Sequence, residues 1–172
     1  MSAKDAFIKK SQENFSKQQA LAEKILEDTK YFCARLYDLT KEIDLWLDKT
    51  CVTVKASQVT HNDANIESLP DGEKYSKYQT KIIKMQNGLK SGSLTPFSVY
   101  GDGANGWCLL EIDNPYNYPR VEKFWLRLYK ESHSWSIRRD VDPSTVSRHT
   151  PLILPEEPLT EDSFFQAIKN LA

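Results

Sequence analysis

The sequence has few cysteines, and they lie far apart. The three are Cys33, Cys51 and Cys108, and no two of them form a C-x-x-C pair. An odd number of widely spaced cysteines does not fit the disulfide framework of a small secreted protein. We therefore expect reduced thiols and a cytoplasmic location. The start of the chain, MSAKDAFIKKSQENF, agrees with this because it lacks the apolar segment of a secretory signal.

Long apolar runs and an excess of charge of one sign are also absent. The longest apolar stretches, such as 107–110 and 152–154, are far shorter than the roughly 18 residues that a membrane span needs. The 23 basic and 24 acidic residues leave a net charge of −1, which argues against electrostatic binding of nucleic acid or of an anionic membrane. With 40% hydrophobic residues, the chain of 172 residues can form one domain with its own core.

Glycine and proline are missing from the helical segment that we expect over residues 1–49, where apolar residues recur at steps of three and four. A continuous helix here would be about 70 Å long, whereas a globule of this size is only about 40 Å across. The helix must therefore either break near residues 11–16 or project as an arm. The sparse apolar pattern before Ala20 favours a break or a frayed start.

Residues 50–140 show the two-residue alternation of an antiparallel sheet. The expected strands cover residues 52–56, 75–86, 89–100, 107–112, 122–130 and 134–139. Asn87-Gly88 predicts a tight hairpin turn in which both residues have positive φ, and Pro96 predicts an edge position or a bulge.

The segment 141–172 begins as a proline-rich tail and ends in a short helix that Thr160 caps. The sequence thus predicts one domain, residues 1–172, with an α+β fold. A long N-terminal helix, continuous or broken, packs on an antiparallel meander of five or six strands, and a short C-terminal helix closes it.

Candidate metal and nucleotide sites have simpler interpretations. His61, Asp63 and Glu67 are too few to form a zinc site without further ligands nearby, so we expect a solvated loop, no metal and no cofactor. Gly101-x-Gly103-x-x-Gly106 has the spacing of a dinucleotide fingerprint, but a strand follows it rather than a helix, which predicts a tight turn.

A cysteine hydrolase is the enzymatic alternative. Cys108, His133 and Asp140 are suitable residue types for a nucleophile, a base and the residue that orients the base. Cys108 lies in an apolar strand, however, which predicts a buried structural thiol rather than an activated nucleophile. We therefore expect a protein that is not an enzyme.

The last hairpin carries the best candidate for a binding surface. Its strict alternation places Phe124, Leu126 and Leu128 on one face and leaves a second face with no obvious covering helix. Aromatic residues and arginine are enriched at protein-binding hot spots. The candidate partner-binding residues on the second face and in the preceding loop are Trp125, Arg127, Tyr129, Arg138, Tyr116, Tyr118 and Arg120.

Two other interpretations of this face remain open. The C-terminal tail could fold across it and pack there. Nucleic-acid bases could also stack on its aromatic rings, but the balanced charges of residues 91–140 provide no electrostatic funnel for nucleic acid.

The order of these elements resembles small immunity proteins of bacterial polymorphic-toxin loci, including those of Rhs and type VI secretion toxins. The resemblance covers roughly residues 50–140. It rests on the pattern L-T-P-x-x-x-x-G-x-G-A-x-G-W, which starts at Leu94 and ends at Trp107, and on the later W-x-I strand that contains Trp135 and Ile137.

This resemblance implies a non-catalytic protein that binds a toxin enzyme and occludes its active site, as a monomer or in a 1:1 heterodimer. A toxin that acts on nucleotides or nucleic acid, such as an ADP-ribosyltransferase or a nuclease, would have a basic cleft. The acidic loop 61–73, with Asp63 and Glu67, or the acidic tail around Glu156 and Glu157 could then steer association or mimic phosphate. A chaperone or adaptor that holds a partner helix along the N-terminal helix is a further alternative.

Overall fold

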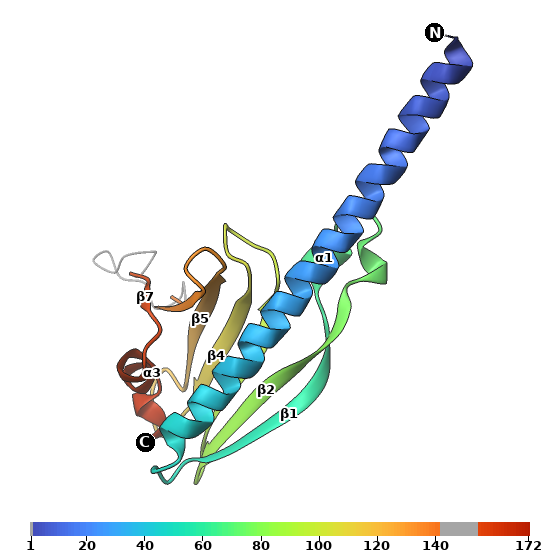
Figure 1. The fold of residues 1–172 in the computed structure, drawn as a ribbon. Coiled ribbons are helices and arrows are strands. Elements are labelled where there is room, and N and C mark those ends of the chain that lie inside the picture. Colours follow the sequence, from blue (N-terminus) through green and yellow to red (C-terminus); the bar gives the residue numbers. More distant parts are fainter. Residues whose placement is uncertain (1, 142–154) are drawn as a thin grey trace.

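The longest element of the chain is α1, which spans Ala3–Leu47 without a break. The computed structural model describes residues 2–141 and 155–172. The helix begins with a capping box between Ser2 and Asp5, and its 45 residues correspond to about 67 Å. The first buried residue is Ile25, so residues 3–20 project from the sheet as an arm (Figure 1). The expected break near residues 11–16 is wrong.

Within the described residues the sheet is antiparallel and has seven strands, which lie in the order of the sequence from β1 to β7. This meander confirms the expected α+β class, with a slightly higher strand count than expected. The strands are β1 Thr53–Asn62, β2 Lys77–Asn87, β3 Lys90–Ser98, β4 Trp107–Asp113, β5 Val121–Tyr129, β6 Ser134–Arg139 and β7 Glu157–Pro158.

The structure bears differently on the two predictions made for β3, the turn at Asn87-Gly88 and the irregularity at Pro96. The β2–β3 turn consists of Gly88 and Leu89, because Asn87 pairs with Lys90 and only Gly88 has a positive φ, 62°. The prediction of a turn at Asn87-Gly88 is therefore wrong by one position. The register of β3 against β4 shifts between Pro96 and Ser98, and β3 is an inner strand, so of the two alternatives at Pro96 the bulge is confirmed and the edge position is wrong.

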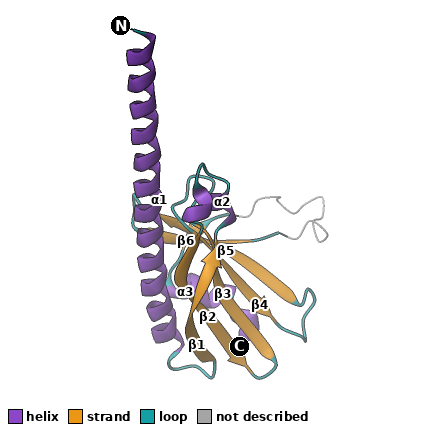
Figure 2. Cartoon of the chain, turned by 90° about the vertical axis from the view of Figure 1, so that its right-hand side faces the viewer, coloured by secondary structure: helices purple, strands orange, loops and turns teal. Residues whose placement is uncertain are grey.

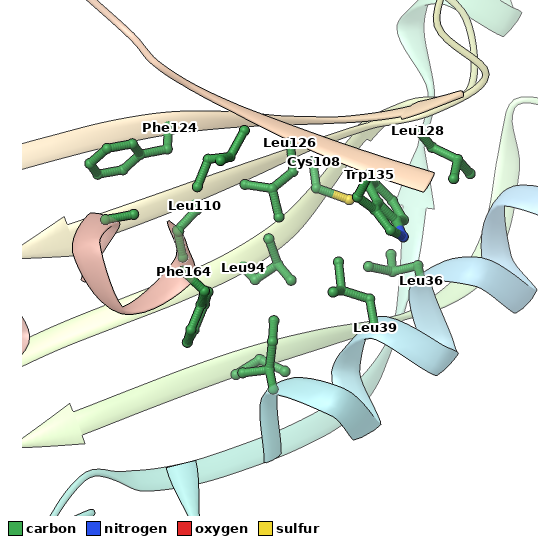
Figure 3. Packing of buried hydrophobic residues seen from close by; sticks show 14 of the residues in the cluster. Leu36, Leu39, Leu94, Cys108, Leu110, Phe124, Leu126, Leu128, Trp135 and Phe164 are labelled. Carbon is green, nitrogen blue, oxygen red and sulfur yellow. The ribbon is translucent and has the colours of Figure 1, made fainter. Parts of the chain in front are cut away.

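Helix α1 and the helix near the C-terminus pack on the same face of the sheet (Figure 2). The C-terminal helix α3, Glu161–Ala167, begins with the expected Thr160 cap. Figure 3 shows Phe164 of α3 and Leu39 of α1 meeting side chains such as Leu94 and Phe124 of the sheet in one core. The smaller elements are α2 Ala64–Glu67, η1 Gly72–Lys74 and η3 Lys169–Leu171. The other face, which we call the outer face, carries no described helix.

Candidate functional site

The side chains of β5 divide between the two faces as the alternation predicts. Phe124, Leu126 and Leu128 are buried in the core beneath α1 and α3. Trp125 and Arg127 lie on the outer face, where Trp125 pairs with Arg138 of β6. The side chains of β5 thus form the predicted second face. The residues of this face differ in how far they are exposed to solvent.

Three aromatic side chains from three strands meet on the outer face. We call Phe97 of β3, Trp107 of β4 and Trp125 of β5 the aromatic cluster. The ring of Trp125 lies 5.0 Å from Phe97 and 5.8 Å from Trp107, edge to face in both cases. Such pairs contribute about 0.5–1.5 kcal/mol beyond their buried area. Phe97 keeps 50% of its surface exposed, so the cluster is ordered and still accessible.

The sequence analysis did not include Phe97 and Trp107 in this surface. Trp107 is placed there by its pairing with Arg127 across β4 and β5. Phe97 lies within the β3 bulge, but burial along β3 still alternates, with Leu94 and Pro96 buried and Phe97 exposed. The alternation that buries Leu94 could therefore have identified Phe97 as an outward residue, whereas its position beside Trp125 depends on the register of β3 against β4.

Arg127 is packed within the protein rather than presented at its surface. Only 7% of the residue is exposed. Its guanidinium carbon lies 4.4 Å from the centre of the Trp107 ring, and its Nη2 donates to the carbonyl oxygen of Asp102 at 2.6 Å. An ion pair of 3.4 Å joins its Nη1 to Glu156. Arg127 therefore holds Trp107 in place from below the accessible surface.

Glu156, just before β7, brings the C-terminal segment onto part of the outer face. Its carboxylate accepts hydrogen bonds from Ser136 Oγ at 2.5 Å and from Tyr129 Oη at 3.0 Å. Although partial burial acts to raise the pKa of Glu156, these hydrogen bonds and the charge of Arg127 lower it below its ordinary value. The alternative of a tail packed on this face thus holds for Arg127 and Tyr129, while the aromatic cluster stays accessible.

The loop between β4 and β5 does not join this cluster. Asp113 pairs with Ser91 at the start of β3, whereas Trp107 pairs with Ser98 at its end. The loop therefore lies at the opposite end of β4 from Trp107. Tyr118 is 96% exposed and Tyr116 is exposed beside it, and Arg120 forms an ion pair of 2.6 Å with Asp113.

The acidic segment 61–73 is not wholly the solvated loop that the sequence predicts. Asp63 is completely buried, because its carboxylate caps α2 and accepts hydrogen bonds from both α2 and β3. Glu67 is exposed on α2. The segment adjoins the end of β3, where His61 Nε2 lies 2.8 Å from the carbonyl oxygen of Phe97. Asp63 therefore cannot contact a partner directly, and only the other acidic residues of this loop can steer one.

The residues of the hypothetical hydrolase are not brought together. Cys108 is fully buried in β4, and loss of solvation raises the pKa of its thiol well above the ordinary value. Cys108 pairs with Leu126 in the middle of β5. His133 lies in the β5–β6 turn, where its Nδ1 is 2.9 Å from the hydroxyl of Tyr31. The backbone N–H of Asp140 donates to the carbonyl oxygen of Lys123, which lies toward the other end of β5.

The glycine-rich segment forms a turn between β3 and β4, as expected. Gly103 has a φ of 76°, and the indole nitrogen of Trp107 donates to the carbonyl oxygen of Gly101 at 2.9 Å. Across residues 2–141 and 155–172, no three His, Cys, Asp or Glu side chains are close enough to hold a metal ion. No described helix is both long and apolar enough to cross a bilayer.

Comparison of the chain with models of protein families, with curated proteins and with solved structures finds no match in any of the three. The function is therefore argued from the geometry of the outer face.

Proposed function

We propose that the protein is an immunity protein that binds a cognate antibacterial toxin enzyme through its outer sheet face and occludes the toxin's active site. The aromatic cluster is the observation that supports this proposal. Its rings already pack against one another and against Arg127, so little side-chain entropy would be lost on binding. Large aromatic residues with part of their surface exposed are the usual anchors of protein interfaces.

The acidic residues beside the cluster suggest the chemistry of the partner. Glu67, Asp71 and Glu73 are exposed in the segment that adjoins the end of β3. A basic cleft, such as that of an ADP-ribosyltransferase or a nuclease, would be attracted by these charges. Reversing the three charges should slow association in a salt-dependent manner, and an on-rate equal to that of the wild type would remove this part of the proposal.

The direct test is co-expression with the toxic product of the neighbouring gene. We expect that the protein co-purifies with this product and abolishes its toxicity. Phe97→Ser should weaken the complex by about 10- to 100-fold, the range typical of an interface hot spot. Leu89→Ser is the matched control, because Leu89 is an exposed apolar residue at the opposite end of β3.

The possible results test the immunity function and the proposed docking surface separately. Undiminished toxicity in the presence of the wild-type protein would refute the immunity function. Rescue of growth with equal affinities for Phe97→Ser and Leu89→Ser would retain the function and refute the aromatic cluster as the docking surface.

The α1 arm favours a second candidate function, that of an adaptor for a partner helix. Phe7, Ile8 and Phe15 are exposed on the arm, and Ile8, Phe15 and Ala22 repeat every seven residues. A partner helix could pack along this row. Deletion of residues 2–18 would abolish binding by an adaptor and would leave binding at the outer face unchanged.

A further inference from the structure

The strand β1 forms one edge of the sheet, and within residues 2–141 and 155–172 this edge has little of the usual protection. Its ten residues, Thr53–Asn62, pair with β2 in an unbroken register, and no described residue pairs with the other side of β1. Lys55 is its only charged residue, and it contains no proline and no bulge. Natural proteins usually shield such an edge with charges, proline, bulges or covering segments, because an open edge pairs with other strands.

The hairpin geometry identifies the backbone groups at this open edge. Asn87 and Lys90 close a two-residue turn, so their backbone groups bond to each other. Alternation along β2 then directs Gln86 and every second residue before it toward β1. The same alternation in β1 leaves five residues with N–H and C=O groups that point away from β2: Val54, Ala56, Gln58, Thr60 and Asn62.

We propose that a second copy of the chain pairs with β1 in antiparallel orientation, about a two-fold axis that passes through Gln58. This register places Ala56 opposite Thr60 of the second copy and Val54 opposite Asn62 of the second copy. All five outward residues of each strand are then paired, which gives about ten backbone hydrogen bonds. The sheet runs continuously through both copies.

The charges of β1 suit pairing with itself. In this register Lys55 faces His61 of the second copy, and no two charged residues oppose each other. Like charges directly opposite would destabilise the pairing. The central pairs contain serine, glutamine and valine, which are compatible with a strand that is half exposed.

The flank of α1 beside β1 offers further apolar area to the second copy. Cys33 lies near Thr80 and Tyr78 of β2, and α1 contacts both β1 and β2, so this side of α1 faces the β1–β2 edge. Leu26 and Tyr37 lie seven residues before and four residues after Cys33, on the same side of the helix. They remain 56% and 43% exposed. A copy added at β1 brings its own α1 to this side.

This dimer is independent of the proposed function, because pairing at the β1 edge leaves the aromatic cluster on β3–β5 free in each copy. It is an alternative to the monomer or 1:1 heterodimer that the resemblance implies. The interface is built mainly from one strand of each copy, so we expect dissociation in the micromolar range.

Sedimentation velocity over a concentration series tests the proposal. The wild type should convert from monomer to dimer below about 100 μM. Gln58→Pro removes an outward N–H and keeps the bonds from β1 to β2, so it should remain monomeric with an unchanged circular dichroism spectrum. Gln58→Ala keeps the N–H and should dimerise like the wild type.

A crosslink provides a second measurement that does not depend on the proline variant. In a Cys51→Ser background, Gln58→Cys places two thiols at the two-fold axis, with Cα atoms about 5.5 Å apart, within disulfide range. Oxidation should give a crosslinked dimer, whereas Thr53→Cys should not. A wild type that stays monomeric at about 100 μM, a folded Gln58→Pro that dimerises, or equal crosslinking at both positions would overturn the proposal.

Discussion

Replacement of Asp63 by asparagine tests whether this buried carboxylate organises the end of the sheet. Its Oδ1 accepts hydrogen bonds from the backbone of Asn65 and Ile66 and from Ser98 Oγ, at 2.9–3.1 Å. Its Oδ2 accepts from the backbone of Val99 at 2.8 Å and from Tyr78 Oη at 3.0 Å. The carboxylate thus joins α2, β2 and the end of β3.

The size of the expected loss in unfolding free energy follows from the hydrogen-bond donors that asparagine cannot satisfy. An amide oxygen at the Oδ1 position keeps three bonds, but the amide NH₂ then faces the buried N–H of Val99, so two donors oppose each other. A buried donor without an acceptor costs about 1–3 kcal/mol, and the retained bonds lose the strength that the charge confers. We expect Asp63→Asn to destabilise the protein by about 2–3 kcal/mol.

Urea unfolding followed by tryptophan fluorescence measures this loss. If Asp63 acted only as the N-cap of α2, asparagine would be nearly as good as aspartate and the change would be close to zero. Glu67→Gln is the matched control, because it removes a charge from an exposed carboxylate on the same short helix, and we expect a change within about 0.5 kcal/mol. Equal unfolding free energies for Asp63→Asn and Glu67→Gln would refute the proposed role of Asp63.

Three further predictions concern other parts of the chain. Native alkylation should modify the exposed Cys51 quickly and leave the buried Cys108 unmodified, as mass spectrometry of the tryptic peptides can check; rapid labelling of Cys108 would contradict its burial. The pKa of Glu156 is lowered in the folded state, so its contribution to stability is present above about pH 4.5 and is lost as the pH falls through the lowered pKa. The difference in unfolding free energy between the wild type and Glu156→Gln should therefore shrink in acid, and a difference that grows would reverse this sign. Deletion of residues 2–18 should change the unfolding free energy by less than about 0.5 kcal/mol, because these residues are all exposed; a larger loss in a urea titration would mean that the arm packs on the domain.

The parts of the fold that depend on local signals could be predicted from the sequence. Alternation in β5 separates the core residue Leu126 from the outward residue Trp125, since one register sets both faces. Thr160 marks the start of α3 because a hydroxyl before an apolar turn satisfies free backbone N–H groups. These features require only near neighbours in the chain.

The continuity of α1 could not be predicted in this way. A sparse apolar pattern before Ala20 is compatible with fraying when the segment is considered alone, because helix nucleation is costly. In the folded protein the docked half from Ile25 to Leu47 provides the nucleus. Extension through residues 3–20 then adds one hydrogen bond for each residue fixed, so a polar arm can remain helical.

The burial of Asp63 depends on partners that lie far away in the sequence. In the sequence alone, Asp63 is one of several acids in a turn-rich segment. Its burial becomes favourable only when Ser98 and Val99, more than thirty residues later, supply donors at the end of β3. The neighbours of Phe97 also depend on distant partners, because alternation in β3 directs its side chain outward but only the pairing of β3 with β4 and β5 brings it beside Trp125.

The glycine-rich turn of the motif that carries the resemblance, residues 101–106, shapes the outer face. A Cβ on Gly101 would lie 2.8 Å from the indole nitrogen of Trp107, and a Cβ on Gly106 would overlap the ring of Phe32 in α1. Glycine at these two positions lets the turn close against both faces of the sheet at once. Trp107 is then held between the turn and Arg127, and it supports Trp125 from the side. The glycine-rich turn therefore fixes the aromatic cluster in advance, which would reduce the entropy lost in the proposed binding.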